Sequence, residues 1–336
     1  MFIIVNAYLC KINKTRRERM KNYVPQLDYL KCIFILLMIL FHLVYIGDSY
    51  PYIKDVVYTF HMPIFLILSG YLSQSEKSIR SFLLAVWWLF VPYACMETGY
   101  VLAASLLPVR ESVGEIGVGV LMKSIFVDPI GPYWYLHTLL LCRTIHYFVK
   151  RIVKSDSSLL SQFILLGLIF WGVSDGIHLM NFGYSMYFLL GIILRECKQN
   201  ILSFFQPTIW SIVPLIILCL YPNNLIRFGL GGIGIVYLTI SLSLWIYPRI
   251  SNNVRRVSCL IGRNTLVLLL FSPLFTMLSR FYQPFFSFDS SGGCFAFFTL
   301  FITVLGCFGI TWCMDKADIS KWFFGRKKML LIREYR

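Results

Sequence analysis

Charged residues are scarce in this chain. Asp, Glu, Lys and Arg make up 14% of its 336 residues, whereas a soluble domain carries roughly 25%. Hydrophobic residues make up 58%, so there are too few polar side chains to cover the surface of a soluble protein. The composition also excludes a disordered chain, a collagen-like repeat and a small disulfide scaffold. The class that remains is a polytopic helical membrane protein.

Among the charged residues, acidic ones are scarcer than basic ones. There are 16 Asp and Glu against 31 Lys and Arg, which gives a formal net charge of +15. In a soluble protein this excess would suggest a nucleic-acid partner. Here the basic residues lie mainly in the connections between apolar segments, so we expect a lipid bilayer as the surroundings and no nucleic-acid binding.

Sequence patterns for metal and redox chemistry are absent as well. The ten Cys form no CxxC pair, and the five His show no i, i+4 spacing. Zinc sites are usually marked by such patterns. Most of the Cys lie within apolar segments, where buried reduced thiols are expected. We therefore expect no bound metal and no bound cofactor.

Long apolar segments are what the chain has in abundance. Each is near the length that a bilayer requires, about 20 residues, and their continuous pattern argues against a β-barrel. They cover residues 30–46, 56–73, 81–107, 133–149, 159–174, 179–194, 208–220, 229–247, 259–278 and 293–314. We predict an all-α, polytopic transmembrane bundle of about ten helices. One transmembrane domain at 29–314 would lie between basic cytoplasmic tails at 1–28 and 315–336.

The basic residues predict the orientation of this bundle. When the first residue is placed in the cytoplasm, most Lys and Arg fall in the two tails and in every second connection. These basic segments are 11–21, 77–80, 150–154, 195–198, 249–256 and 316–336. The remaining connections carry few basic residues, as the positive-inside rule requires of outer loops. We therefore expect a multi-pass protein of the cell (inner) membrane with both termini in the cytoplasm.

Ionisable residues occur inside the first predicted span. Asp28 and Lys31 are three residues apart, so they share a helix face and can pair at the cytoplasmic edge. A pair of anchoring side chains at the membrane surface is an equally good reading. His42 lies deeper, about 12 residues or roughly 18 Å into the span. Because ionisable groups at such depth are expensive, His42 is a candidate functional residue.

The second predicted span carries His61 at a similar depth, roughly 18 Å from its cytoplasmic end. Pro63 follows closely, removes one backbone hydrogen bond and can open the helix beside His61. Ser69 and Gly70 are small and allow another helix or a ligand to approach. Two unrelated packing histidines are the competing interpretation, but the matched depth favours a shared site.

Glu97, in the third span, is the third candidate. An acid at this position could orient a histidine or stabilise its charge. An interfacial break of the helix after Pro92 would explain the residue equally well.

The segments around these residues resemble the acyltransferase-3 family of integral membrane O-acyltransferases, which includes fucose 4-O-acetylase-like members. The most specific likeness is 60–65 (FHMPIF) followed by 69–71 (SGY), which is similar to the FHMPxF…SGY segment of the family. Residues 27–31 (LDYLK) resemble the family's LDxxR motif, with Lys31 in place of the arginine. His42 stands eleven positions after Lys31, as in the family.

Further segments extend the resemblance over most of the chain. Residues 77–80 (KSIR) resemble an RxxR signal, 131–136 (GPYWYL) a PLWFL segment, and 262–266 (GRNTL) a GKNSL segment. The family often has His-Pro where this chain has Ser272-Pro273.

The resemblance implies that an acyl group, usually acetyl, is transferred from cytoplasmic acyl-CoA to a hydroxyl of a surface polysaccharide or its lipid-linked precursor. Acyl-CoA carries phosphates and cannot cross a bilayer, so basic side chains at the cytoplasmic face would hold it. Lys31, Lys77 and Arg80 are the expected contacts.

In this reading His42 is the general base or the transient acyl carrier, and His61 orients the thioester carbonyl or stabilises the oxyanion. Glu97 would complete the catalytic group. The residues expected to shape the structure or the substrate pore are Asp28, Pro63, Ser69, Gly70, Trp134, Tyr135 and Asn264.

Two other classes of function compete with an enzyme. A transporter or flippase for a glycan precursor could use the intramembrane histidines as a proton relay. A sensor or scaffold without chemistry has no need to bury two histidines, which makes it the weaker alternative. The sequence carries no signal for an oligomeric state.

Overall fold

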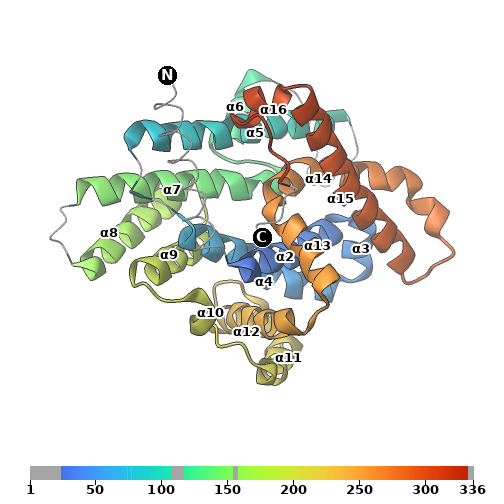
Figure 1. Ribbon diagram of the computed structural model, residues 1–336, viewed down its shortest axis with the longest axis horizontal. Coiled ribbons are helices and arrows are strands. Elements are labelled where there is room, and N and C mark those ends of the chain that lie inside the picture. The colour runs from blue at the N-terminus through green and yellow to red at the C-terminus, as the bar shows by residue number, and fades with distance from the viewer. Residues whose placement is uncertain (1–23, 74, 77, 107–116, 154–157, 332–336) are drawn as a thin grey trace, which may run out of the picture.

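Helices make up nearly all of the computed structural model, which describes residues 24–73, 75–76, 78–106, 117–153 and 158–331 (Figure 1). No β-strand occurs in these residues. The longer helices are α2 (Pro25–His42), α4 (Pro51–Tyr71), α5 (Ile79–Leu106), α7 (Trp134–Ile152), α8 (Leu159–Trp171), α9 (Phe182–Glu196), α12 (Leu230–Ile246), α14 (Thr265–Tyr282) and α15 (Gly293–Lys316). The shorter ones are α3 (Val44–Ser49), α6 (Val118–Phe126), α10 (Ile201–Phe204), α11 (Ile212–Leu220), α13 (Asn252–Arg263) and α16 (Ile319–Phe324).

The helices have the length and composition of membrane spans. Within the described residues, seven are long and apolar enough to cross a bilayer. Each of the ten predicted ranges holds a helix; α7 is less apolar than these seven because it carries His137, Arg143 and His146, and α9 and the segment Ile209–Leu220 are shorter. The predicted all-α, polytopic bundle is therefore confirmed.

Two predicted boundaries were wrong. The range 259–278 is not one helix but two, because α13 ends at Arg263 and α14 begins at Thr265. The break lies at Asn264, whose side chain bonds to the backbone of another segment. The first span begins at Pro25, not at residue 30, because proline fits the first turn of a helix. It ends at His42, since Leu43 adopts an extended conformation with ψ of 116°.

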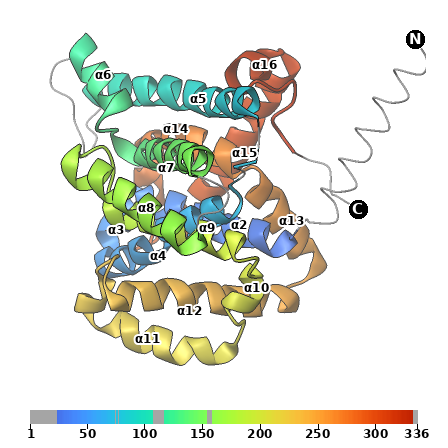
Figure 2. The same ribbon diagram turned by 90° about the vertical axis from the view of Figure 1, so that its left-hand side faces the viewer.

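The predicted C-terminal tail is partly folded against the bundle. The short helix α16 packs against α5 at one edge of the molecule (Figure 2). The carboxylate of Asp315 accepts hydrogen bonds from the backbone N–H groups of Met329 and Leu330, at 2.9 and 3.0 Å. Residues after the last span are therefore tied back to its end.

The connections gather at two opposite ends of the bundle. At one end Lys150 binds Glu196 at 2.5 Å, and Arg195 donates to the carbonyl oxygen of Tyr71. At the other end Tyr50 donates to the carbonyl oxygen of Ser291. We call these the inner and the outer end. That the inner end faces the cytoplasm stays a prediction from the charge pattern.

The helices stack in layers between two edges. Figure 2 shows α5 at one edge and α11 and α12 at the other, with α2, α4, α7 and α9 between them. Hydrophobic residues from α2 and α4 form the centre of the largest buried cluster. The helices that carry His42 and His61 thus lie in the interior of the bundle.

One close helix crossing joins α4 to α9. A Cβ atom added to Gly70 would lie 2.1 Å from the carbonyl oxygen of Phe188, and one added to Gly191 would lie 2.1 Å from that of Ile67. Small residues at such a crossing let two backbones touch. The close approach that the sequence predicts at Gly70 is made by a helix.

Gly70→Ala should therefore lower the melting temperature of the protein in detergent. The clash with backbone should cost about 1–3 kcal/mol, which exceeds the gain of roughly 0.5–1 kcal/mol that alanine brings to a helix interior. Gly99→Ala is the matched control, because nothing lies within 4 Å of the added Cβ. Gly99→Ala should raise the melting temperature slightly, and an equal response of both variants would contradict the crossing.

Candidate active site

His42 and His61 lie around one pocket inside the bundle. Both rings pack against the ring of Tyr58, with centroid distances of 5.9 Å for His42 and 5.1 Å for His61. The two histidines and Tyr58 line a cavity of about 160 Å³, which we call the histidine pocket. His42 is the last residue of α2, and His61 lies in the middle of α4. The similar depth inferred from the sequence corresponds to a shared site.

Each histidine ring is oriented by its own helix. Nδ1 of His42 lies 2.7 Å from the carbonyl oxygen of Met38, and Nδ1 of His61 lies 2.8 Å from that of Val57. A carbonyl oxygen only accepts, so Nδ1 carries the proton in both rings. In a neutral ring Nε2 then bears the lone pair that a general base uses.

Pro63 lies two residues after His61 within the unbroken helix α4. Because proline has no N–H, the carbonyl of Thr59 lacks its usual helical donor. The hydroxyl of Thr59 donates to the carbonyl oxygens of Asp55 and Leu225, at 2.9 and 3.1 Å. The helix does not open at Pro63; this stretch of α4 is tied to the outer connection before α12.

Arg227, which no sequence motif marks, reaches the histidine pocket from that outer connection. Its guanidinium donates to the hydroxyl of Tyr184 at 2.6 Å and lies 5.7 Å from the ring centroid of Tyr58. Its backbone carbonyl accepts from Tyr187 at 2.5 Å. Trp134 completes this wall, with its ring 4.5 Å from that of Tyr184. A fixed positive charge is therefore held beside two histidines.

A larger cavity, the outer vestibule, opens from the histidine pocket toward the outer end. It has a volume of about 940 Å³ and shares His42, Tyr58 and Trp134 with the pocket. Many of its other lining residues are aromatic, charged or hydroxyl-bearing, and these include Tyr45, Asp48, Lys54, Tyr100, Ser272 and Arg280. Ser272, which stands where the family often has histidine, thus faces the vestibule and not the pocket.

Glu97 supports the wall of the vestibule. Its side chain is fully buried, and Oε1 accepts the backbone N–H of Ile130 at 2.7 Å. Ile130 leads into the segment 131–134, of which Gly131, Pro132 and Trp134 line the vestibule. Among the described residues, those that line the histidine pocket do not include Glu97. The geometry makes Glu97 a positioning residue, while the predicted charge stabilisation of a histidine stays a prediction.

A third cavity, the inner cavity, lies on the other side of the pocket. It has a volume of about 200 Å³ and shares Met38, Met62 and Leu269 with the histidine pocket. Ser69 and Tyr135 line it and are joined by a hydrogen bond of 2.8 Å between their hydroxyl groups. The three cavities are neighbours that share lining residues, and they follow one another from the outer end into the inner half of the bundle, with the histidines at the middle one. We call this series of cavities the path.

Asp28 and Lys31 form the pair that their spacing predicts, and the structure adds Arg263. Lys31 Nζ lies 2.6 Å from Asp28 Oδ1, and Arg263 Nε lies 3.4 Å from Asp28 Oδ2. Lys31 is one helical turn from Ile35, which lines the inner cavity. This network is therefore placed beside the inner end of the path.

Asn264 is a structural residue in this fold. Its amide nitrogen donates to the carbonyl oxygens of Leu260 and Leu331, and its amide oxygen accepts the N–H of Leu331 at 2.9 Å. It joins the break between α13 and α14 to the C-terminal segment.

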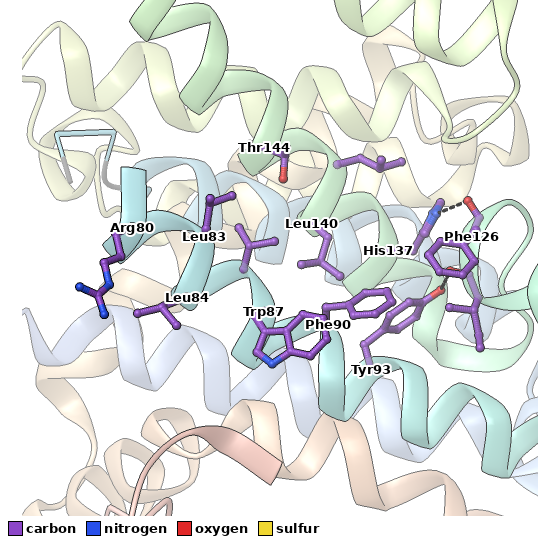
Figure 3. Close-up of a pocket in the computed structure, with 13 residues that line it drawn as sticks. Arg80, Leu83, Leu84, Trp87, Phe90, Tyr93, Phe126, His137, Leu140 and Thr144 are labelled. Carbon is purple, nitrogen blue, oxygen red and sulfur yellow. Dashed lines mark hydrogen bonds between the residues drawn. The ribbon is translucent and has the colours of Figure 1, made fainter. Parts of the chain in front are cut away.

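Arg80 lies apart from the path. Figure 3 shows it at one end of an apolar groove along α5, with Trp87 and Phe90 in the middle and Tyr93 and His137 at the far end. Lys77, its predicted partner, lies outside the described residues. The groove and the inner cavity share no lining residue in the part of the chain that the structure describes. Lys31 and Arg80, two of the predicted donor contacts, are therefore not brought together around one cavity.

Comparison with known proteins gives the class of the chain. The family model of the acyltransferase-3 family, described as an acyltransferase domain, matches residues 24–312. The chain belongs to the acyltransferase-3 family. It is accordingly a membrane acyltransferase. Neither the curated proteins nor the solved structures contain a significant match to it.

Asp28→Ala should destabilise the protein more than Lys31→Ala. Removing the buried carboxylate leaves two cations close together, which should cost about 3 kcal/mol. Removing Lys31 leaves Asp28 paired with Arg263. Loss of the half-buried Lys31 side chain should therefore lower the free energy of unfolding by less than about 1 kcal/mol. Denaturant unfolding of both variants in the same detergent measures the difference. Equal losses, or a larger loss for Lys31→Ala, would contradict the network.

Proposed function

We propose that this acyltransferase moves an acetyl group from cytoplasmic acetyl-CoA to a hydroxyl of a cell-surface glycan or of its lipid-linked precursor. It would act in the cell (inner) membrane with both termini in the cytoplasm. The observation that carries the proposal is the position of His42 and His61, between a cavity of the inner half and a vestibule of the outer end. A donor and an acceptor from opposite sides can meet only at such a point.

The inferred reaction is a single acyl transfer. Nε2 of His42 takes the proton of the acceptor hydroxyl while the hydroxyl oxygen bonds to the thioester carbon. The carbon–sulfur bond then breaks, and the thiolate of CoA receives the proton from His42. Ester and thiol are the products, so atoms and charges balance. His61 lines the same pocket and would orient the reacting groups.

Arg227 supplies the charge that such a reaction needs. Negative charge develops on the thioester oxygen as the new bond forms, and a fixed donor in a water-poor site stabilises it. The guanidinium is held by Tyr184 and by the anchored backbone of its loop. It therefore needs no rearrangement when the charge appears.

The outer vestibule suits a glycan acceptor. Its volume lies in the range of ligand pockets. It combines aromatic surfaces from Tyr45, Tyr100 and Trp134 with charged and hydroxyl groups. Sugars present apolar faces and many hydroxyls, and both kinds of surface are offered here.

Purified protein in detergent separates this proposal from transport of a glycan precursor. An enzyme should release CoA from acetyl-CoA and acetylate an added glycan, detected by mass spectrometry. If no acceptor from the host envelope is acetylated while reconstituted vesicles move a glycan precursor, the proposal is wrong and the histidines serve a proton relay.

His42→Ala should lower kcat by at least about 100-fold, since general-base catalysis contributes 10²–10⁴-fold. His61→Ala should lower kcat as well, because its ring faces the same pocket. His178→Asn is the control: this histidine is exposed at the outer end and has φ of 59°, which asparagine tolerates. Normal acetylation by His42→Ala at a normal protein level would remove His42 from the mechanism.

Arg227→Gln should reduce kcat by about 10²–10³-fold, the usual effect of losing one oxyanion donor, with a smaller change in the KM for acetyl-CoA. Lys123→Gln, which removes an exposed positive charge at the outer end, should leave both constants unchanged. A loss confined to KM would show that Arg227 binds the substrate in its ground state rather than the transition state.

A further inference from the structure

Arg143 is an arginine in the middle of α7, which lies in one of the predicted spans. It lies in α7, nine residues before the inner end of the helix at Ile152, which is about 14 Å along the axis. Ionisable residues at this depth are costly and mark substrate pathways or paired sites. The side chain lines the inner cavity together with Ser69 and Tyr135.

Other basic side chains of the inner half have partners in the protein. Lys31 and Arg263 bind Asp28, Lys150 binds Glu196, and Arg195 donates to the carbonyl of Tyr71. For Arg143, no ion pair or hydrogen bond to another described residue exists. A guanidinium has five N–H donors, and those of Arg143 have no acceptor among the described residues although the side chain lines the cavity.

The inner cavity is small and mostly apolar. Its walls come from Ile35 and Met38 of α2, Phe65 of α4, and Leu136 and Leu139 of α7. The polar groups are confined to the Ser69–Tyr135 hydroxyl pair, Arg143 and Thr265. Such a lining suits a slender ligand of methylene groups with a few hydrogen-bonding groups, and not a phosphate or a sugar ring.

The distance from the inner end of the bundle to the histidine pocket also limits which ligand fits. Ser69 and His61 are eight residues apart on α4, about 12 Å, and the inner end of α4 at Tyr71 is about 15 Å from His61. The pantetheine arm of CoA has a dozen bonds between its phosphate and its sulfur, so it spans about as far as four extended residues, roughly 14 Å. An arm that enters at the inner end therefore places its thioester at the histidine pocket.

We propose that the inner cavity binds the pantetheine arm of the acyl donor, with the Arg143 guanidinium donating to the amide carbonyl oxygens of the arm. This inference rests on the proposed function. The phosphates of CoA stay outside the cavity at the inner surface, near Lys31. Met38, Met62 and Leu269, which line both cavities, surround the thioester end of the arm.

The test compares acetyl-CoA with S-acetylpantetheine, which has the arm but no nucleotide and no phosphate of CoA. Arg143→Gln should raise the KM of both donors by about tenfold or more, the effect of losing hydrogen bonds from a charged donor. Its kcat should change less than threefold, and the KM of the acceptor should not change. Arg143→Lys should give a smaller rise, because lysine has fewer donors. Arg151→Gln, at the exposed inner end of the same helix, is the control. It should leave the KM of acetyl-CoA and the KM of S-acetylpantetheine unchanged.

Two kinetic results would overturn the proposal. An unchanged donor KM in Arg143→Gln would remove Arg143 from the donor site. A rise for acetyl-CoA alone would show that Arg143 binds the phosphates and not the arm. If Arg143→Gln does not fold, Ser69→Phe fills the cavity instead and should weaken both donors; normal use of both donors by that variant would likewise overturn it.

Binding of CoA and of pantetheine to the purified protein, followed by thermal shift, keeps this inference separate from the proposed function. Absence of transfer by the wild-type protein, with CoA and pantetheine bound in an Arg143-dependent way, would sink the acetylation proposal and leave the cavity assignment intact. Acetyl transfer by the wild-type protein without any Arg143-dependent binding of CoA or pantetheine would support the acetylation proposal and overturn the cavity assignment.

Discussion

The bilayer offers no hydrogen-bond partner to a polar group, and the rest of this structure depends on that constraint. Backbone groups meet it by forming helices. Polar side chains meet it by facing inward, along one line through the bundle: Ser69 with Tyr135, then His61 and His42, then the charged vestibule. A row of intramembrane polar groups is energetically costly, and such groups usually mark a functional site. The path itself therefore argues for chemistry at its centre.

The path is not the same on its two sides. The inner cavity is about 200 Å³ and mostly apolar, whereas the outer vestibule is about 940 Å³ and lined by charged and aromatic side chains. Met38, Met62 and Leu269 stand where the inner cavity meets the histidine pocket. In the proposed reaction the small side would take the extended arm of the donor and the large side the glycan. A transporter would have to pass one substrate through both sides, which fits this difference less well.

Residues close in sequence gave the most accurate predictions. The Asp28–Lys31 pair follows from i, i+3 spacing, and the common level of His42 and His61 follows from counting residues along two antiparallel helices. The prediction of one helix over 259–278 was wrong because the segment is largely apolar. The break between α13 and α14 depends on Asn264, which binds Leu331 far along the chain. The role of Arg227 could not be predicted, because an arginine in an outer connection is usually an exposed charge. In the folded protein its side chain is turned inward and binds Tyr184.

The amino-acid sequence alone determined that the chain is a helical membrane protein, which segments form its apolar helices and which of them carry histidines, because these properties depend on composition and on spacing within a helix. Only the tertiary structure decided which polar groups share a cavity. It placed Arg143 in the inner cavity and Arg80 on a separate groove of α5, although both are basic residues near apolar segments. The physical reason is that the face a side chain presents depends on how each helix is rotated against its neighbours. That rotation is fixed by contacts such as Gly70 with Gly191, between residues far apart in the chain.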